Sequence, residues 1–180
     1  MKKYIKIFDN AIEYKTLGNF IRYVNTVDFQ DAKVGDGVVN KTIRNTFTFP
    51  LNNHGKSFTT VHWNNYLWYA LNTYIKKYAS EFRHVEWKFL ETIEVLKYEE
   101  GGFYREHVDD FRENPRTLSG IFLMNNDYEG GELCFNLEDE QIIIETLPNR
   151  LILWPSNFCF PHEVKPVKKG IRYSLVTWAR

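Results

Sequence analysis

The sequence predicts a mainly β fold whose helices are confined to the N-terminal half, an α+β protein built on an antiparallel barrel or jelly roll. Two observations lead to this prediction. After residue 90 the chain consists of short runs rich in β-branched and aromatic residues, separated by Gly, Asn and Pro turns. Before residue 90, apolar residues recur at intervals of three and four, which is the period of a helix. Aromatic residues make up 17% of the chain, which suits a β-rich core or a site walled by rings.

The N-terminal half contains two predicted helices. The clearer one spans residues 63–82, where Trp63, Leu67, Leu71 and Tyr78 fall on one apolar face. A weaker helical pattern spans residues 11–25. Residues 31–57 contain several Gly, Pro and Asn residues, and we expect extended segments joined by turns there.

The C-terminal half contains seven predicted strands. They cover residues 92–98, 118–124, 132–137, 141–146, 150–154, 160–164 and 172–178. No helical pattern separates them, so the strands should pair with one another in antiparallel fashion, with the N-terminal helices packed outside. With 180 residues the chain is long enough for one domain and short for two. We therefore expect a single domain over residues 1–180, in which residues 1–90 support a β core formed by residues 91–180.

Charge and composition limit the classes of partner. Lys plus Arg and Asp plus Glu are both 23, so no long-range field favours nucleic acid or a membrane surface, and neither partner is expected. The basic start of the chain has no apolar run behind it, and no segment has the length and apolarity of a membrane span. With only two cysteines as well, we expect reduced thiols and a cytoplasmic location.

A metal-binding pattern lies at His107 and Asp109. In an extended segment, residues two apart point to the same face, so this imidazole and this carboxylate can bind one ion. The pair alone is a weak signal. His162 supplies a third ligand if a strand-rich core brings the two segments together. Two His and one carboxylate leave metal positions open for a cosubstrate and O₂, as in non-haem Fe(II) oxygenases, although zinc would accept the same ligands.

Arg172 favours Fe(II) over zinc as the metal. It stands at the inner end of an otherwise apolar strand, where burying a positive charge is costly unless an anion faces it. The planar guanidinium can bind a carboxylate through two hydrogen bonds. The dicarboxylate 2-oxoglutarate fits this requirement, because its charges and that of Asp109 balance the charges of Fe(II) and Arg172.

Further motifs accompany these residues between Glu94 and Trp178. They are LKY (96–98), GFY (102–104), His107-x-Asp109, FLMN (122–125), GGEL (130–133), PH (161–162), and PV (166–167) followed by Gly170 and Arg172. In this order they resemble the 2-oxoglutarate/Fe(II) oxygenases of the prolyl 4-hydroxylase type. Collagen-type members of that family usually have Lys in place of Arg172 and Thr in place of Leu133.

This resemblance implies a double-stranded β-helix (jelly roll) core in a single catalytic domain, with iron bound by His107, Asp109 and His162. It implies that Arg172 binds the remote carboxylate of 2-oxoglutarate and that Tyr98 donates a hydrogen bond to it. Arg116 and Trp178 stand where such enzymes contact the substrate. The implied activity uses Fe(II), 2-oxoglutarate and O₂, with ascorbate as a reductant. It hydroxylates a C–H bond, first of all of a prolyl residue in a peptide or protein, and releases succinate and CO₂.

Other functions stay open at this point. Within the family, the substrate can be another amino acid, a small molecule or a nucleic-acid base. Outside it, a jelly-roll metal-binding module or a metal-dependent isomerase would keep the three ligands without oxygen chemistry. Arg172 is the discriminating residue, because an isomerase has no need to hold a remote carboxylate. Formation of succinate from 2-oxoglutarate would separate the two classes.

Overall fold

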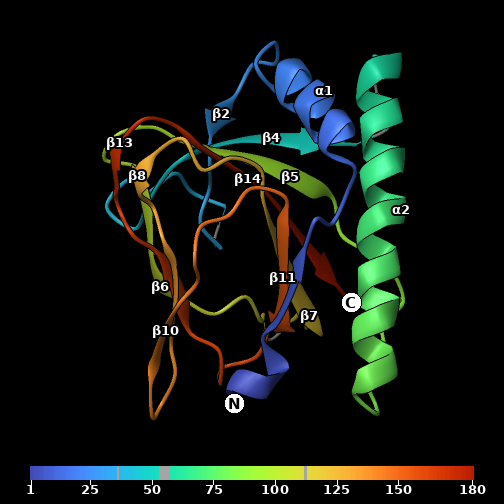
Figure 1. The fold of residues 1–180 in the computed structure, drawn as a ribbon. Coiled ribbons are helices and arrows are strands. Elements are labelled where there is room, and N and C mark those ends of the chain that lie inside the picture. Colours follow the sequence, from blue (N-terminus) through green and yellow to red (C-terminus); the bar gives the residue numbers. More distant parts are fainter. Residues whose placement is uncertain (36, 53–56, 112) are drawn as a thin grey trace.

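The strands form two antiparallel sheets that face each other, as the computed structural model shows for residues 1–35, 37–52, 57–111 and 113–180 (Figure 1). The strand order is β1-β11-β7-β14-β5-β4-β2 in the large sheet and β10-β9-β12-β6-β3 in the small one. A further pair, β13-β8, lies at one end of the molecule.

The bounds of these strands are as follows. The large sheet contains β1 (Lys6–Asp9), β2 (Gln30–Asp31), β4 (Phe47–Leu51), β5 (Ile93–Tyr98), β7 (Leu118–Leu123), β11 (Arg150–Pro155) and β14 (Arg172–Ala179). The small sheet contains β3 (Arg44–Asn45), β6 (Phe103–His107), β9 (Leu133–Asn136), β10 (Gln141–Ile143) and β12 (His162–Val164). The third pair consists of β8 (Glu129–Gly130) and β13 (Val167–Lys169).

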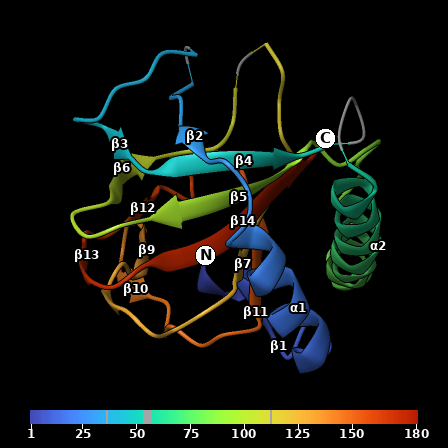
Figure 2. The ribbon, with the colours of Figure 1, turned by 90° about the horizontal axis from the view of Figure 1, so that it is seen from above.

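Two α-helices cover the outer face of the large sheet (Figure 2). They are α1 (Tyr14–Val24) and α2 (Phe58–Glu81), and a short 3₁₀ helix, η1 (Lys2–Tyr4), precedes them. Phe20 of α1 and Leu67 of α2 pack in one buried cluster with Phe122 of the sheet. The helix α2 begins at Phe58 because the Ser57 hydroxyl accepts a hydrogen bond from the Thr60 amide at 3.3 Å.

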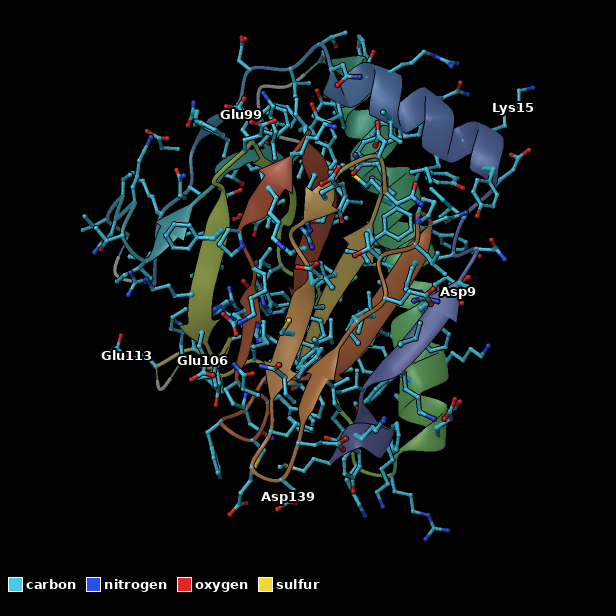
Figure 3. The ribbon with its side chains drawn as sticks, turned by 60° about the vertical axis from the view of Figure 1, so that its left-hand side comes forward. Asp9, Lys15, Glu99, Glu106, Glu113 and Asp139 are labelled. Carbon is cyan, nitrogen blue, oxygen red and sulfur yellow. The ribbon has the colours of Figure 1, made fainter. Side chains whose placement is uncertain are left out.

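The large sheet is buried on both faces, which gives the protein two cores. In β7, Phe122 packs toward the helices, whereas its neighbours Ile121 and Leu123 belong to a second cluster between the sheets. This alternation follows from the two-residue period of a strand. Side chains from both sheets lie in the space between them (Figure 3). Two of the residues predicted to form the site, Tyr98 and Trp178, belong to this second core.

The prediction of a mainly β fold with N-terminal helices is confirmed, with local differences. The helix expected at 63–82 begins earlier, at Phe58, and the strand expected at 160–164 begins only at His162. A hydrogen bond from the Phe160 amide to the Asn157 carbonyl forms a turn there instead. The edge strand β1 was not predicted. Residues 31–57 contribute β3, β4 and the second residue of β2, while residues 36 and 53–56 lie outside the described part of the chain.

Arg150 illustrates how this fold accommodates a buried charge. Its guanidinium forms two hydrogen bonds, of 2.6 and 3.0 Å, with the carboxylate of Asp9 on the edge strand β1 (Figure 3). The interaction lowers the pKa of Asp9, since a hydrogen-bonded guanidinium favours the ionised carboxylate.

None of the helices described is both long and apolar enough to cross a membrane.

Candidate metal centre

Strand register brings the three predicted metal ligands together. In the small sheet, β12 pairs with β6 so that His162 lies directly opposite His107. Asp109 follows two residues after His107, and its carboxylate oxygens lie 3.6 Å from the Nε2 atom of His107 and 3.4 Å from that of His162. One ligand atom from each residue lies within 4.8 Å of the other two. Asp109 and His162 are buried, so these donors meet in a space largely shielded from solvent.

Hydrogen bonds orient both histidine rings. The Nδ1 atom of His107 lies 2.8 Å from the Arg105 carbonyl oxygen, and that of His162 lies 3.0 Å from the Phe160 carbonyl oxygen. A carbonyl oxygen only accepts, so each Nδ1 carries the proton and each Nε2 keeps its lone pair for a metal. Tyr104 stacks on His107 with 3.6 Å between ring centres and limits rotation of that ring.

The protonation states suit metal binding. Burial, followed by the proximity of His162, lowers the pKa of His107 to about 4, so this ring is neutral at pH 7. Burial by itself would raise the pKa of Asp109, but the two histidine rings and hydrogen bonds from Ser119 and Trp178 hold it below its usual value. Burial also raises the pKa of Tyr104 to about 12. The centre therefore offers the neutral imidazole of His107, the imidazole of His162 and one carboxylate.

Three side chains that do not themselves offer a metal ligand hold Asp109 in place. The Ser119 hydroxyl and the Trp178 indole hydrogen-bond its carboxylate, and the Arg116 guanidinium donates to its backbone carbonyl oxygen at 3.2 Å. The Ser119 hydroxyl also lies 2.8 Å from the Ser156 hydroxyl and shares a hydrogen bond with it, in which either group can donate. Sequence patterns did not indicate Ser119, since a single serine in an apolar strand carries no periodic signal.

Replacing Ser119 with alanine is expected to weaken divalent-metal binding by about 10- to 100-fold, the usual cost of losing a partner that orients a ligand. The fold should persist, because alanine fits the space of serine. Titration calorimetry with Mn(II) would measure the change, with Ser80→Ala on the exposed side of α2 as a matched control. Unchanged affinity in Ser119→Ala would mean that Trp178 alone suffices to orient Asp109.

A cavity of about 510 Å³ adjoins the three donors. Both sheets contribute to its wall, which is apolar apart from a few charged groups. The apolar lining includes Leu96, Ile121, Leu133, Trp154, Val164 and Val176, and the charged lining includes Lys33, Arg44, Glu94, Asp109 and Arg116. A pocket of this size and character suits a small ligand together with part of a larger one.

Arg172 adjoins this cavity through Tyr98, which forms part of the wall. The two residues are cross-strand partners, and the guanidinium carbon lies 4.9 Å from the centre of the Tyr98 ring. Arg172 is 0% exposed, and its Nη1 atom donates to the Ser174 hydroxyl at 2.8 Å. Its Nε and Nη2 atoms have no acceptor among the residues described. A buried cation with two free donors needs an anion, which fits the carboxylate of a bound ligand.

Gly131 makes room for Arg172. Its φ is +66°, a conformation that side chains disfavour, and a Cβ atom there would lie 3.0 Å from the Cδ atom of Arg172. Gly131 therefore shapes the space in which the Arg172 side chain lies.

Arg116 and Trp178, predicted to contact the substrate, both line the cavity. The guanidinium of Arg116 lies 3.8 Å from the Trp178 ring centre, and it forms two hydrogen bonds, of 2.7 and 2.8 Å, with the Glu91 carboxylate. Glu91 thus pairs with Arg116 within the protein, and the same carboxylate also accepts a hydrogen bond from Arg180. The sequence did not indicate Glu91, because nothing in it shows that residues 91 and 116 are neighbours.

The comparisons with known sequences agree with this geometry. Residues 93–180 match the family model of the 2OG-Fe(II) oxygenase superfamily. A PKHD-type hydroxylase from Synechococcus sp. (strain JA-2-3B'a(2-13)) is 32% identical over 101 residues, covering 52% of this chain and 44% of the relative. One from Acaryochloris marina is 27% identical over 181 residues, covering 98% of this chain and 78% of the relative. The chain thus spans less than half the length of the first relative.

Solved structures with a similar fold include prolyl hydroxylases. One from Trichoplax adhaerens, in complex with a hypoxia inducible factor oxygen degradation domain peptide fragment, has a TM-score of 0.82 at 19% identity, covering 98% of this chain and 83% of that one. A prolyl-4-hydroxylase from Pseudomonas putida has a TM-score of 0.77 at 20% identity, covering 98% and 92%. At such identities the likeness shows the fold, and it confirms the predicted jelly-roll core.

Proposed function

Because residues 93–180 belong to the 2OG-Fe(II) oxygenase superfamily, we propose that this protein is a 2-oxoglutarate- and Fe(II)-dependent dioxygenase. It hydroxylates a C–H bond, and its substrate is a prolyl residue in a peptide or protein. The products from the cosubstrate are succinate and CO₂, and ascorbate serves as a reductant. Residues 1–180 act as one catalytic domain, in which residues 1–90 support the β core.

The observation that carries this proposal is the unpaired guanidinium of Arg172 beside a cavity that also contains three metal-ligand side chains. The Nε2 atoms of His107 and His162 and the carboxylate of Asp109 would hold Fe(II). Arg172 would bind the remote carboxylate of 2-oxoglutarate through its two free N–H groups, with Tyr98 as a second donor. A metal-binding module or an isomerase gives no reason for this buried cation.

Bound together, Fe(II) and 2-oxoglutarate supply the chemistry, in which O₂ is activated as the cosubstrate loses CO₂ and oxygen enters a substrate C–H bond. The protein's own contribution is placement. Ser119 and Trp178 hold the Asp109 carboxylate toward the two imidazoles. Leu96, Ile121 and other apolar side chains keep water away from the reacting groups.

The prolyl substrate rests on similarity. The similar solved structures include prolyl hydroxylases, and one of these was solved with a peptide. The cavity extends beyond the three donors to Arg44 and Arg116, leaving room for a peptide side chain next to the cosubstrate.

Purified protein with Fe(II) and ascorbate is expected to release succinate from 2-oxoglutarate and to add one oxygen atom to proline in a peptide library. Succinate can be measured by chromatography and the oxidised residue by fragment mass spectrometry. Oxygen found on another residue would mean that this residue, and not proline, is the substrate. Protein that neither binds 2-oxoglutarate nor forms succinate with any substrate would be a binding module instead.

A further inference from the structure

Two arginines belong to the cavity wall, and they differ in how their charge is compensated. Arg116 is paired with Glu91 through two hydrogen bonds. Arg44, at the start of β3, has no carboxylate within ion-pair distance among the residues described, although Glu94 and Asp109 line the same cavity. Among the residues described, the cavity wall therefore contains one arginine that is paired with a carboxylate, which Arg180 shares, and one arginine that is not paired.

Arg44 is held firmly although its charge is unpaired. It is 9% exposed, and its Nη1 atom donates to the Lys33 carbonyl oxygen at 2.8 Å. Its guanidinium carbon lies 4.8 Å from the ring centre of Tyr104, which in turn stacks on His107. The Nε atom of Arg44 is buried and has no hydrogen-bond partner in the described part of the chain. An ordered, buried donor without an acceptor is unfavourable unless a ligand supplies one.

We propose that Arg44 binds a carboxylate of the substrate and makes the enzyme selective for a substrate that carries one close to the hydroxylated residue. The carboxylate belongs to an acidic side chain or to a free C-terminus of the substrate. Lys33, which lines the same part of the wall, adds a second positive charge. This inference rests on the proposed hydroxylase function and names the class of its substrate.

The cosubstrate is not the anion that Arg44 requires. Arg172 already offers two free donors for it, and it lies on β14 of the large sheet beside Tyr98. Arg44 lies on β3 of the small sheet, paired with β6 opposite Tyr104. Arg172 and Arg44 thus lie on different sheets. Arg172 would bind the cosubstrate carboxylate, and Arg44 would bind the substrate carboxylate.

The test uses proline-centred peptides with Glu or Gln at each flanking position, and with a free or amidated C-terminus. The protein contains Fe(II) and 2-oxoglutarate, and KM and kcat are measured for each peptide. We expect one Glu position, or the free C-terminus, to lower KM by roughly 10- to 100-fold, the effect of a charge-assisted hydrogen bond in a buried site. The peptides for which KM falls show whether the carboxylate belongs to an acidic side chain or to the C-terminus.

Variants then assign the preference to Arg44. Arg44→Gln should abolish the preference by raising KM for the preferred peptide, with kcat largely unchanged. Arg44→Glu should change the preference to Lys at the same position. Arg83→Glu is the control, since it makes the same charge change on an exposed side chain in the turn after α2. It should leave the preference intact. Circular dichroism melting would show that each variant is folded.

Two results would overturn the inference. One is equal KM for the Glu and Gln peptides together with equal KM for free and amidated ends. The other is a loss of 2-oxoglutarate affinity in Arg44→Gln, which would assign Arg44 to the cosubstrate. Calorimetric titration of the wild-type protein with 2-oxoglutarate distinguishes failure of this inference from failure of the proposed function. If the wild-type protein does not bind 2-oxoglutarate, the hydroxylase function itself is contradicted.

Discussion

Replacing Asp109 with alanine is expected to weaken Fe(II) binding by roughly a hundredfold to a few thousandfold and to abolish succinate formation. Asp109 is the one carboxylate of the described three-residue cluster, and the two histidines carry no negative charge to balance the metal. Removing the charged partner of a buried ion costs about 3–5 kcal/mol, and each 1.4 kcal/mol corresponds to about a factor of ten in affinity. Anaerobic titration calorimetry would measure this loss.

The neighbouring residue Asp110 provides the control. It is exposed, and its Oδ1 atom accepts a hydrogen bond from the Arg116 backbone amide at 3.1 Å. A surface substitution of this kind usually changes a free energy by no more than about 0.5 kcal/mol. Asp110→Ala should therefore bind Fe(II) within about twofold of the wild type. Equal affinity of Asp109→Ala and the wild type would remove Asp109 from the metal site.

Replacing Arg172 with methionine is expected to change two properties in opposite directions. Without ligand, the variant should be more stable by about 1–4 kcal/mol, because an unpaired buried charge gives way to an apolar side chain of similar length. Its affinity for 2-oxoglutarate should fall by about 2–5 kcal/mol, the cost of losing a buried charge pair in a complex. Urea unfolding and 2-oxoglutarate titration in the presence of Mn(II) measure these two effects.

Arg150→Met is the matched control for this prediction. Arg150 is also buried, but it already has a carboxylate partner in Asp9. Its loss should lower the free energy of unfolding by about 1–3 kcal/mol, since a charge-assisted interaction is removed, and leave 2-oxoglutarate binding unchanged. If Arg172→Met instead destabilised the unliganded protein as Arg150→Met does, the guanidinium would have an internal partner and no need for a diacid.

The sequence predicted the three candidate metal ligands in part from a local pattern. His107 and Asp109 are two apart in an extended segment, which places them on one face wherever the segment lies. That His162 lies opposite His107 depends on the pairing of β12 with β6, a long-range register that no local pattern encodes. The likeness of the surrounding motifs supplied this third ligand.

Other parts of the site depend on burial, which the sequence did not reveal. Arg44 lies in a polar segment without periodicity, and it is buried only because β3 pairs with β6 over Tyr104. Glu91 and Arg116 are far apart in sequence and meet across the end of the large sheet. The edge strand β1 was missed for a similar reason, since its partner β11 follows it by more than half the chain.

A crystal structure with Fe(II) and 2-oxoglutarate, prepared without oxygen, would test the central claim most directly. Anomalous scattering locates the iron, and the electron density locates both ends of the diacid. We predict iron bound by His107, Asp109 and His162, with the remote carboxylate of 2-oxoglutarate on the two free N–H groups of Arg172. Iron bound elsewhere, or a diacid that leaves Arg172 without an anion, would contradict the proposed function.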